Sequence, residues 1–463
     1  MESGRPQKAG ESLMRILAVT LVLTVMSATM FNIVLPEIRL DFHLTYAQVS
    51  WVSSAYMLTY AIGSVTYGKL ADIYKLKHLL TFGLIFFAVG SMIGLASQAY
   101  WMVLLGRVLQ AVGASVIPAA AMIIPSRYFP PETRGRALGL SAAGLALGSA
   151  VGPVVSALVV SLVHWRWLFC MPLLVLPMLP LFRKYLGDEE RKKGKYDGLG
   201  GSLLAGAVAL LLLAVTYEKG GLAAAGLIGF LLFIARIRYT AEPFVRPHLF
   251  KNRSYSLGLV MAFLAGGIGY SFPFLSPQLF SNVYHLVPGA IGLAMFPAAI
   301  SSALLGRSGG KLADAKGNPF LFYSAAALLL TGFALLSTFA GSPPAFIALF
   351  LIIGNIGQTF MQIALSNTIS RTLPKEQVGV GMGFLAMTNF MAGSVAAVMY
   401  SKVMDHGPIV AFNPINAYSN AFVFSNIYFF LAVGYTGIIV LYYLQFDREA
   451  RKRRSLAGGM AEG

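Results

Sequence analysis

Long apolar runs separated by short polar segments dominate the chain. Fourteen of these runs reach the length of about 20 residues that an α-helix needs to cross a bilayer. They lie near 14–36, 47–70, 78–97, 101–125, 136–160, 166–186, 198–217, 221–238, 255–280, 288–309, 319–340, 344–369, 379–403 and 423–446. The pattern predicts an all-α polytopic membrane protein with fourteen transmembrane helices.

The composition agrees with this prediction. Apolar residues make up 57% of the 463 residues and charged residues only 11%, less than half of the share that is usual in soluble domains. These values exclude a soluble enzyme, a disordered chain and a disulfide scaffold, and the single Cys170 has no partner for an internal disulfide. In a polytopic protein the net charge of +17 marks cytoplasmic loops, so we expect a lipid bilayer and no nucleic acid as partner.

The positive residues orient the predicted helices. If the N-terminus is cytoplasmic, all of the 35 Lys and Arg residues fall on that side except Arg39, Arg107, Arg166, Lys219 and Lys402. Cytoplasmic loops carry such an excess, and we therefore predict a multi-pass protein of a bacterial cytoplasmic membrane with both termini in the cytoplasm. The first run is too long for a signal-peptide core, so we expect it to be retained as a helix.

The pentapeptide Gly-Lys-Leu-Ala-Asp occurs twice, at 68–72 and 310–314, each time at the predicted cytoplasmic end of a helix. This repeat predicts two homologous halves. We divide the chain into an N-terminal six-helix bundle (1–190), a cytoplasmic linker with an inserted helix pair (191–245), and a C-terminal six-helix bundle with a basic tail (246–463). Two repeated bundles around a central site are typical of secondary transporters.

Polar and glycine-rich patterns inside the runs suggest where such a site lies. Arg107 stands within a predicted helix, where a charge is costly without a cavity or a partner, and Gln110 follows one turn later. Glycines four residues apart form a smooth helix face that ends in a Gly-Pro pair; they are Gly144, Gly148 and Gly152, followed by Pro153. In the twelfth run Asn355, Gln358 and Gln362 share one helix face.

These stretches, together with residues 32–36 and 51–56, resemble the major facilitator superfamily over nearly the whole chain. Within it they are most similar to fourteen-helix drug:proton antiporters, and especially to the tetracycline efflux proteins of Gram-positive bacteria. The resemblance implies a major-facilitator fold and cytoplasmic gating by the two pentapeptide loops (Gly68, Asp72, Lys75, Lys77, Gly310 and Asp314). It further implies a coupling role for Arg107 and Gln110. The glycine face with its Gly-Pro ending is the family's antiporter signature, and it implies that the protein exports its substrate.

Two readings remain for the uncharged polar residues in the predicted helices. They either bond to neighbouring helices or contact a substrate, and we take as candidates for substrate binding Asn32, Tyr56, Gln110, Asn355, Gln358, Gln362 and Asn389. No metal site is expected, because the six histidines lack paired ligand spacing. The absence of a phosphate-binding glycine loop excludes ATP-driven export by this chain, and no cofactor is expected.

The resemblance fails at the acidic residues. The related exporters carry carboxylates in their first, fifth and thirteenth helices, whereas this sequence has Ser27-Ala28-Thr29, Ser149-Ala150 and Ala392-Gly393-Ser394 there. Protons would then be carried by Glu37, by Asp405 with Lys402, or by His164 and His406. Alternatively, the substrate is neutral, zwitterionic or anionic with Arg107 as its partner, or the protein is a facilitator not coupled to protons.

The leading interpretation is a monomeric secondary exporter that exchanges small amphipathic drug-like molecules, with tetracycline as one candidate, for protons. The alternative is export of a specific endogenous metabolite or metallophore. A membrane enzyme, such as a lipid-modifying transferase, should show catalytic acids or histidines at an interface and would leave the repeated pentapeptide unexplained. We therefore do not expect an enzyme.

Overall fold

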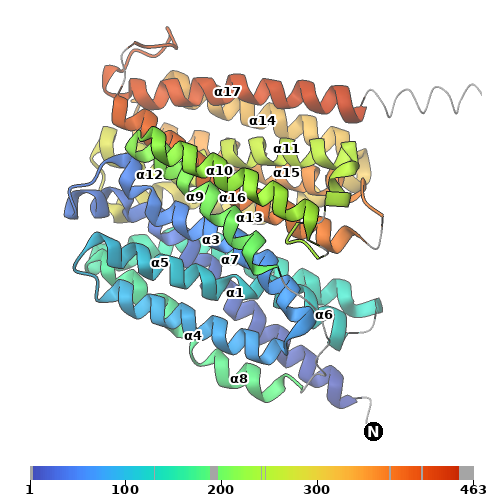
Figure 1. Cartoon of the computed structure of the whole chain (residues 1–463). Helices are drawn as coiled ribbons and strands as arrows, with labels where there is room; N and C mark the ends of the chain where they lie inside the picture. Colours follow the sequence, from blue (N-terminus) through green and yellow to red (C-terminus); the bar gives the residue numbers. More distant parts are fainter. Residues whose placement is uncertain are drawn as a thin grey trace, which may run out of the picture.

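The computed structural model describes residues 4–129, 131–187, 197–240, 242–245, 247–374, 377–407 and 410–447, and the described part is helical throughout. Thirteen helices in it are long and apolar enough to cross a membrane, by length and composition. The chain passes from one end of the bundle to the other with each of them (Figure 1). The predicted all-helical fold is confirmed.

The fourteenth predicted span, 47–70, corresponds to α3 (Trp51–Ile73), which is 23 residues long. It packs between α5 and α16 and so lies inside the bundle. It is not among the thirteen, because serines, threonines and tyrosines are spread along its length and interrupt every long apolar stretch. With α3 the helices correspond to the fourteen predicted runs.

The N-terminal half has six spans, and two of these consist of two consecutive helices each, α5 with α6 and η1 with α8. Pro36 does not end the first helix, which continues to Asp41, five residues beyond the predicted boundary. The sixth span is not one α-helix, because it begins as a 3₁₀ helix that contains Pro172. The elements are α1 (Gly4–Asp41), α2 (Tyr46–Val49), α3, α4 (Leu76–Leu95), α5 (Tyr100–Ala114), α6 (Val116–Tyr128), α7 (Pro131–Leu162), η1 (Trp165–Val175) and α8 (Met178–Tyr185).

The two helices that the sequence predicts as an inserted pair, α9 (Gly198–Tyr217) and α10 (Gly220–Tyr239), lie in front of the other helices in Figure 1; the name inserted pair is kept for them, and halves for the segments before and after them. Helix α9 contacts α3 of one half and α16 of the other. The elements of the second half are η2 (Pro247–Lys251), α11 (Arg253–Gly269), α12 (Ser271–Tyr284), α13 (Pro288–Lys316), α14 (Asn318–Phe339), α15 (Pro344–Ser370), α16 (Val378–His406), η4 (Ser419–Ala421), α17 (Phe422–Tyr442) and η5 (Tyr443–Asp447).

The two ends of the bundle differ in charge and are called the basic end and the far end. The basic end holds residues 69–77, 183–187 and 311–317, and both ends of the described chain lie there, at the right of Figure 1. The far end holds residues 41–50, 163–167 and 402–407. The halves meet mainly through two helix pairs, α3 with α16 and α7 with α13. These pairs form the walls of the space described next.

Candidate functional site

A cavity of ≈ 530 Å³ lies between the two halves, which is in the size range of small-molecule sites. Its walls come from α1, α3 and α7 of the first half and from α11, α12, α13, α15 and α16 of the second. The polar lining residues are all uncharged: Thr29, Asn32, Ser149, Tyr270, Ser302, Asn355, Gln358, Thr359, Gln362 and Asn389. Among the described residues, none with a charged side chain lines this cavity.

Two glycines of α11 create room for two of the carboxamides. A Cβ atom on Gly269 would lie 2.0 Å from Gln358 Nε2, and one on Gly266 would lie 3.0 Å from Asn389 Oδ1. Gly266 and Gly269 are three residues apart and thus share a helix face. The side chains of Gln358 and Asn389 therefore lie flat against α11, at positions that a larger residue would occupy.

The first half contributes Asn32 to the cavity wall. Asn32 Oδ1 accepts hydrogen bonds from Ser53 Oγ at 2.6 Å and from the Tyr270 hydroxyl at 3.3 Å. Tyr270 belongs to the second half, so this bond crosses between the halves. Phe390 adds an aromatic wall, with its ring centroid 4.5 Å from that of Tyr60.

Arg107 does not line the cavity and is 0% exposed. Its Nε donates to the Val52 carbonyl at 3.1 Å, and its Nη1 donates to the Ser27 carbonyl at 3.1 Å and to Gln110 Oε1 at 3.0 Å. The guanidinium lies between two rings, with 4.3 Å to the Phe31 centroid and 4.1 Å to the Tyr56 centroid. Arg107 thus joins α1, α3 and α5 directly behind the cavity wall.

Tyr56 and Gln110 also lie in this layer, at 0% exposure, and neither lines the cavity. Gln110 Nε2 donates to Ser91 Oγ at 2.8 Å. Of the residues that the sequence suggests for substrate contact, the structure brings five to the cavity: Asn32, Asn355, Gln358, Gln362 and Asn389. The other two serve the packing around Arg107.

The glycine face of α7 packs on α1. A Cβ on Gly144 would lie 3.0 Å from the Ala18 carbonyl oxygen, and one on Gly148 would lie 2.8 Å from the Val22 carbonyl oxygen. A Cβ on Gly152 would lie 2.0 Å from Thr29 Oγ1. Further along α7, Pro153 borders the cavity, and its carbonyl oxygen is 3.0 Å from where a Cβ on Gly292 of α13 would be. This helix therefore contacts both halves.

At the far end, Asp405 of α16 joins the halves. Its two carboxylate oxygens accept hydrogen bonds from the backbone N–H groups of Tyr46, at 2.7 Å, and Ala47, at 2.8 Å. Tyr46 and Ala47 are the first two residues of α2, whose N-terminus is capped by a capping box of Thr45 and Gln48. Closer to the cavity, Ser54 and Ser394 exchange hydroxyl-to-carbonyl bonds between α3 and α16. The far end is thus closed.

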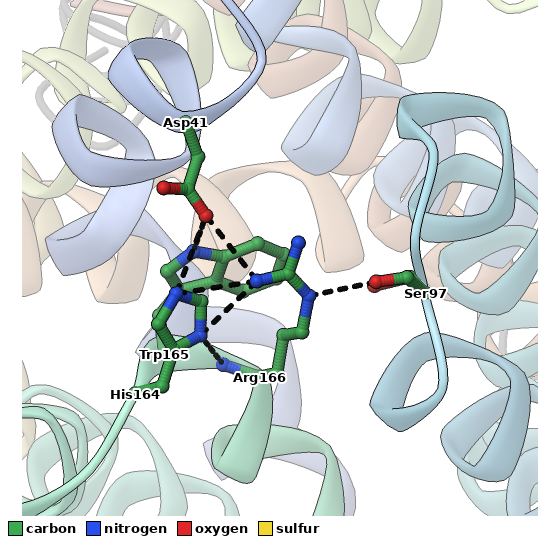
Figure 2. Close-up of polar contacts among 5 residues, drawn as sticks. All are labelled: Asp41, Ser97, His164, Trp165 and Arg166. Atoms are coloured by element: carbon green, nitrogen blue, oxygen red, sulfur yellow. Dashed lines mark hydrogen bonds and ion pairs between the residues drawn. The ribbon is translucent and has the colours of Figure 1, made fainter.

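A second polar cluster at the far end stays within the first half (Figure 2). Asp41 Oδ2 accepts a bond from Trp165 Nε1 at 2.9 Å and lies 3.3 Å from both His164 Nε2 and Arg166 Nη1. Arg166 also donates to the Ser97 carbonyl at 2.7 Å. Glu37, one turn before Asp41, lines a separate hollow beside this cluster rather than the central cavity.

The residues proposed for gating lie at the basic end. A Cβ on Gly68 or Gly310 would meet nothing within 4 Å, and Asp314 is exposed. Lys75 is the N-cap residue of α4, and Lys77 lies in its first turn. The side chain of Asp72 is outside the described part of the structure. The glycines of both pentapeptides therefore face open space in this state.

Ionic and hydrogen-bond contacts hold α9 and α10 together at the basic end and tie them to α16 at the far end. At the basic end, Asp197 accepts bonds from the backbone N–H groups of Gly200 and Phe244 and from Arg236 Nε. Burial raises the pKa of the Asp197 carboxyl, but these donors outweigh it and hold the pKa below its usual value. At the far end Glu218 forms an ion pair of 2.6 Å with Lys402 of α16.

The chain is similar to known transporters. The model of the Major Facilitator Superfamily matches residues 17–397. The riboflavin transporter RibZ of Clostridioides difficile (strain 630) is 28% identical over 404 residues, 84% of this chain and 86% of that protein. Multidrug resistance protein 3 of Bacillus subtilis (strain 168) is 29% identical over 278 residues, 58% of this chain and 54% of that protein.

Solved structures agree on the fold. The nucleoside transporter NupG matches with a TM-score of 0.66 at 13% identity, over 94% of this chain and 100% of that one. A bacterial homologue of the human lysosomal transporter Spinster, in an inward-facing and unoccupied conformation, also matches with a TM-score of 0.66, at 15% identity over 94% of this chain and 97% of that one.

Proposed function

The chain belongs to the major facilitator superfamily, and from this premise we propose that it is a secondary active exporter of small amphipathic molecules, driven by protons. The observation that carries the proposal is the cavity between the halves, which is closed at the far end by the Asp405 contacts. A closure on one side of a central site is what alternating access requires. The similarity to a multidrug resistance protein supports efflux.

We place the basic end in the cytoplasm of a bacterium, in line with the positive-inside rule. The proposed transporter acts as a monomer. In the described state the substrate enters from the cytoplasm. Rocking of the halves would then break the Asp405 contacts, while the loops with Gly68, Asp72, Lys75 and Lys77 and with Gly310 and Asp314 would close the basic end.

Proton coupling is assigned to groups at the far end. Of the two acidic candidates for proton coupling, Glu37 and Asp405, we choose Asp405, because its hydrogen bonds cross between the halves. Protonation of its carboxylate removes the negative charge that the two N–H groups of α2 bind, and so favours opening. Arg107 and Gln110 fix the packing of α1, α3 and α5, so that movement at the cavity is transmitted through one rigid layer.

A second candidate is transport of one specific metabolite. Similarity to a riboflavin transporter over most of both chains favours it, as does the absence of acidic side chains among the described residues that line the cavity. A tetracycline–metal complex, or a cationic drug, would find no carboxylate there. An uncharged cavity is also compatible with a facilitator that is not coupled to protons.

The test uses purified protein in liposomes with an imposed pH gradient and an internal pH dye. Riboflavin, tetracycline and the cation ethidium are offered in separate experiments. We expect uptake of at least one compound together with proton movement, and loss of both in Arg107→Ala. Uptake that continues at the same rate after the gradient is collapsed would contradict proton coupling and favour a facilitator.

A further inference from the structure

The central cavity has a charge property that limits its ligands. Its described lining is uncharged, and the nearest buried charge on the first half, Arg107, is held by three hydrogen bonds and two rings behind the wall. A short chain of hydrogen bonds connects Arg107 to the cavity wall. Arg107 donates to the Val52 carbonyl, and the next residue, Ser53, donates to Asn32, which lines the cavity. A net charge inside such a site lacks a counter-charge, and a cation also faces this fixed positive charge.

The carboxamides of the second half have unused hydrogen-bonding capacity. Gln358 Oε1 and Asn389 Oδ1 are buried and have no hydrogen-bond partner. Asn389 Nδ2 reaches Gln362 Oε1 only at 3.4 Å, near the limit of a hydrogen bond. A carboxamide has two N–H donors and an acceptor oxygen, and leaving buried polar groups unpaired is unfavourable. Both oxygens lie against α11 and are shielded from the cavity, so a ligand that donates to them must draw the amides toward the cavity, and the pairing gained would favour its binding.

The glycine face of α11 fixes where these groups can go. Gly269 leaves the room that the Gln358 amide fills, and Gly266 does the same for Asn389. The two amides lie along this face of α11 as a narrow polar strip. A strip of this kind suits the flat edge of a ligand.

Apolar and aromatic side chains form other parts of the cavity wall and match a flat ligand. Tyr270 and Phe390 line the cavity, together with the adaptable side chains Met57 and Met295. The Tyr270 ring stacks on Phe274, with 5.8 Å between centroids, and Phe390 packs on Tyr60, so both rings are supported from behind. Supported rings of this kind contact planar ligands without reordering.

From these observations we propose that the cavity selects uncharged planar molecules with an amide, imide or ureide edge, and that Gln358 and Asn389 bind this edge. The inference rests on the proposed transport function and specifies its substrate class. Glutamine and asparagine act here as specificity residues that contact the ligand. Cations of the same size are excluded, because the described lining supplies no counter-charge and the positive Arg107 lies behind it.

The experiment measures binding of three tricyclic fluorescent probes to the purified full-length protein. They are lumiflavin, which is neutral and has an imide N–H; its N3-methyl derivative, which lacks that donor; and proflavine, a cation. The variants are Gln358→Leu and Asn389→Leu. The matched control is Asn367→Leu, because Asn367 lies on α15 half a turn away from Gln358 in angle and does not line the cavity.

We expect lumiflavin to bind, N3-methyl-lumiflavin to bind about tenfold more weakly, and proflavine not to bind. Gln358→Leu and Asn389→Leu should each lower the affinity for lumiflavin about tenfold, while Asn367→Leu should leave this affinity unchanged. Gln358→Glu, which adds a carboxylate, should reduce lumiflavin binding and introduce proflavine binding. This last variant tests the inference even if the leucine variants fail to fold.

Three results would overturn the inference. If proflavine binds at least as well as lumiflavin and is transported in liposomes, the substrate class is wrong although the transport function stands. If none of the probes binds and none is transported, both the substrate class and the proposed function are contradicted. Equal binding of lumiflavin and its N3-methyl form would also refute the role assigned to the carboxamides.

Discussion

The substitution Asp405→Asn tests the closure of the far end. The carboxylate accepts two backbone N–H groups from the other half, at 2.7 and 2.8 Å. Hydrogen bonds to a charged group contribute about 1.5–3 kcal/mol each and neutral ones about 1 kcal/mol. Asparagine keeps one neutral acceptor, so the substitution should cost the closed state at least about 2 kcal/mol. Since 1.36 kcal/mol is a factor of ten, the ratio of open to closed far ends should rise about 30-fold.

The assay is a distance measurement between spin labels at the far end. Labels on Gln98 of the first half and on the exposed Ile415 of the second half report the separation, after replacement of Cys170 by serine. Glu218→Gln is the control, since it removes an exposed ion pair to α16 that should matter little. A distance distribution in Asp405→Asn that is identical to the wild type would refute the assignment of Asp405 as the closing contact.

Three further outcomes are expected. Arg107→Lys keeps the charge but cannot form the three bonds to α1, α3 and α5 together, so transport should fall at least tenfold and the melting temperature of the purified protein should drop; unchanged transport would contradict the role of the layer. Gly148→Ala places a Cβ 2.8 Å from a backbone carbonyl of α1, whereas Gly139→Ala on the same helix meets nothing within 4 Å; only the first should lower the melting temperature, and equal effects would refute the close packing of α7 on α1. The hydrogen bond from Lys402 and the positive charge of Lys402 lower the pKa of Glu218 from its usual 4.5. The ion pair therefore contributes to stability above pH 4.5, and this contribution is lost as the pH falls through the lowered pKa of the folded protein. The titration of the Glu218 carboxyl, followed by NMR, should thus lie below pH 4.5, and a titration at or above this pH would contradict the pairing with Lys402.

Most of the fold could be predicted because bilayer-crossing helices leave a direct record in hydropathy. The pattern gave the right class and nearly all the spans, including α3, whose polar residues lower its apolar content. It failed at boundaries. Helix α1 passes Pro36 and ends at Asp41, since a helix can continue outside the apolar layer where hydropathy no longer marks it. The 3₁₀ start of the sixth span depends on local backbone bonding, which hydropathy does not report.

The site was harder to predict than the fold. The polar stripe on α15 pointed to the cavity because helical spacing places Asn355, Gln358 and Gln362 on one face. The sequence could not separate these from Tyr56 and Gln110, which are equally polar but packed around Arg107. That difference depends on which helix faces which neighbour.

Other features of the site need the tertiary structure altogether. The roles of Gly266 and Gly269 depend on the amides of two other helices that lie against α11. The contact of Asp405 with α2 joins residues more than 350 positions apart in the chain. Neither pattern is visible along one helix. A pair of glycines on the face of an apolar run was the only available signal, and such pairs are common in membrane helices.

We propose the uncharged cavity as the transport site, reached from the basic end in the described state. Ser302 lines this cavity, and Ser302→Cys in a Cys170→Ser background gives one labelling site. In oriented vesicles, a membrane-impermeant maleimide should label it from the cytoplasmic side, and lumiflavin should slow the reaction. Labelling only from the outside, or at a rate that no transported compound changes, would contradict the claim.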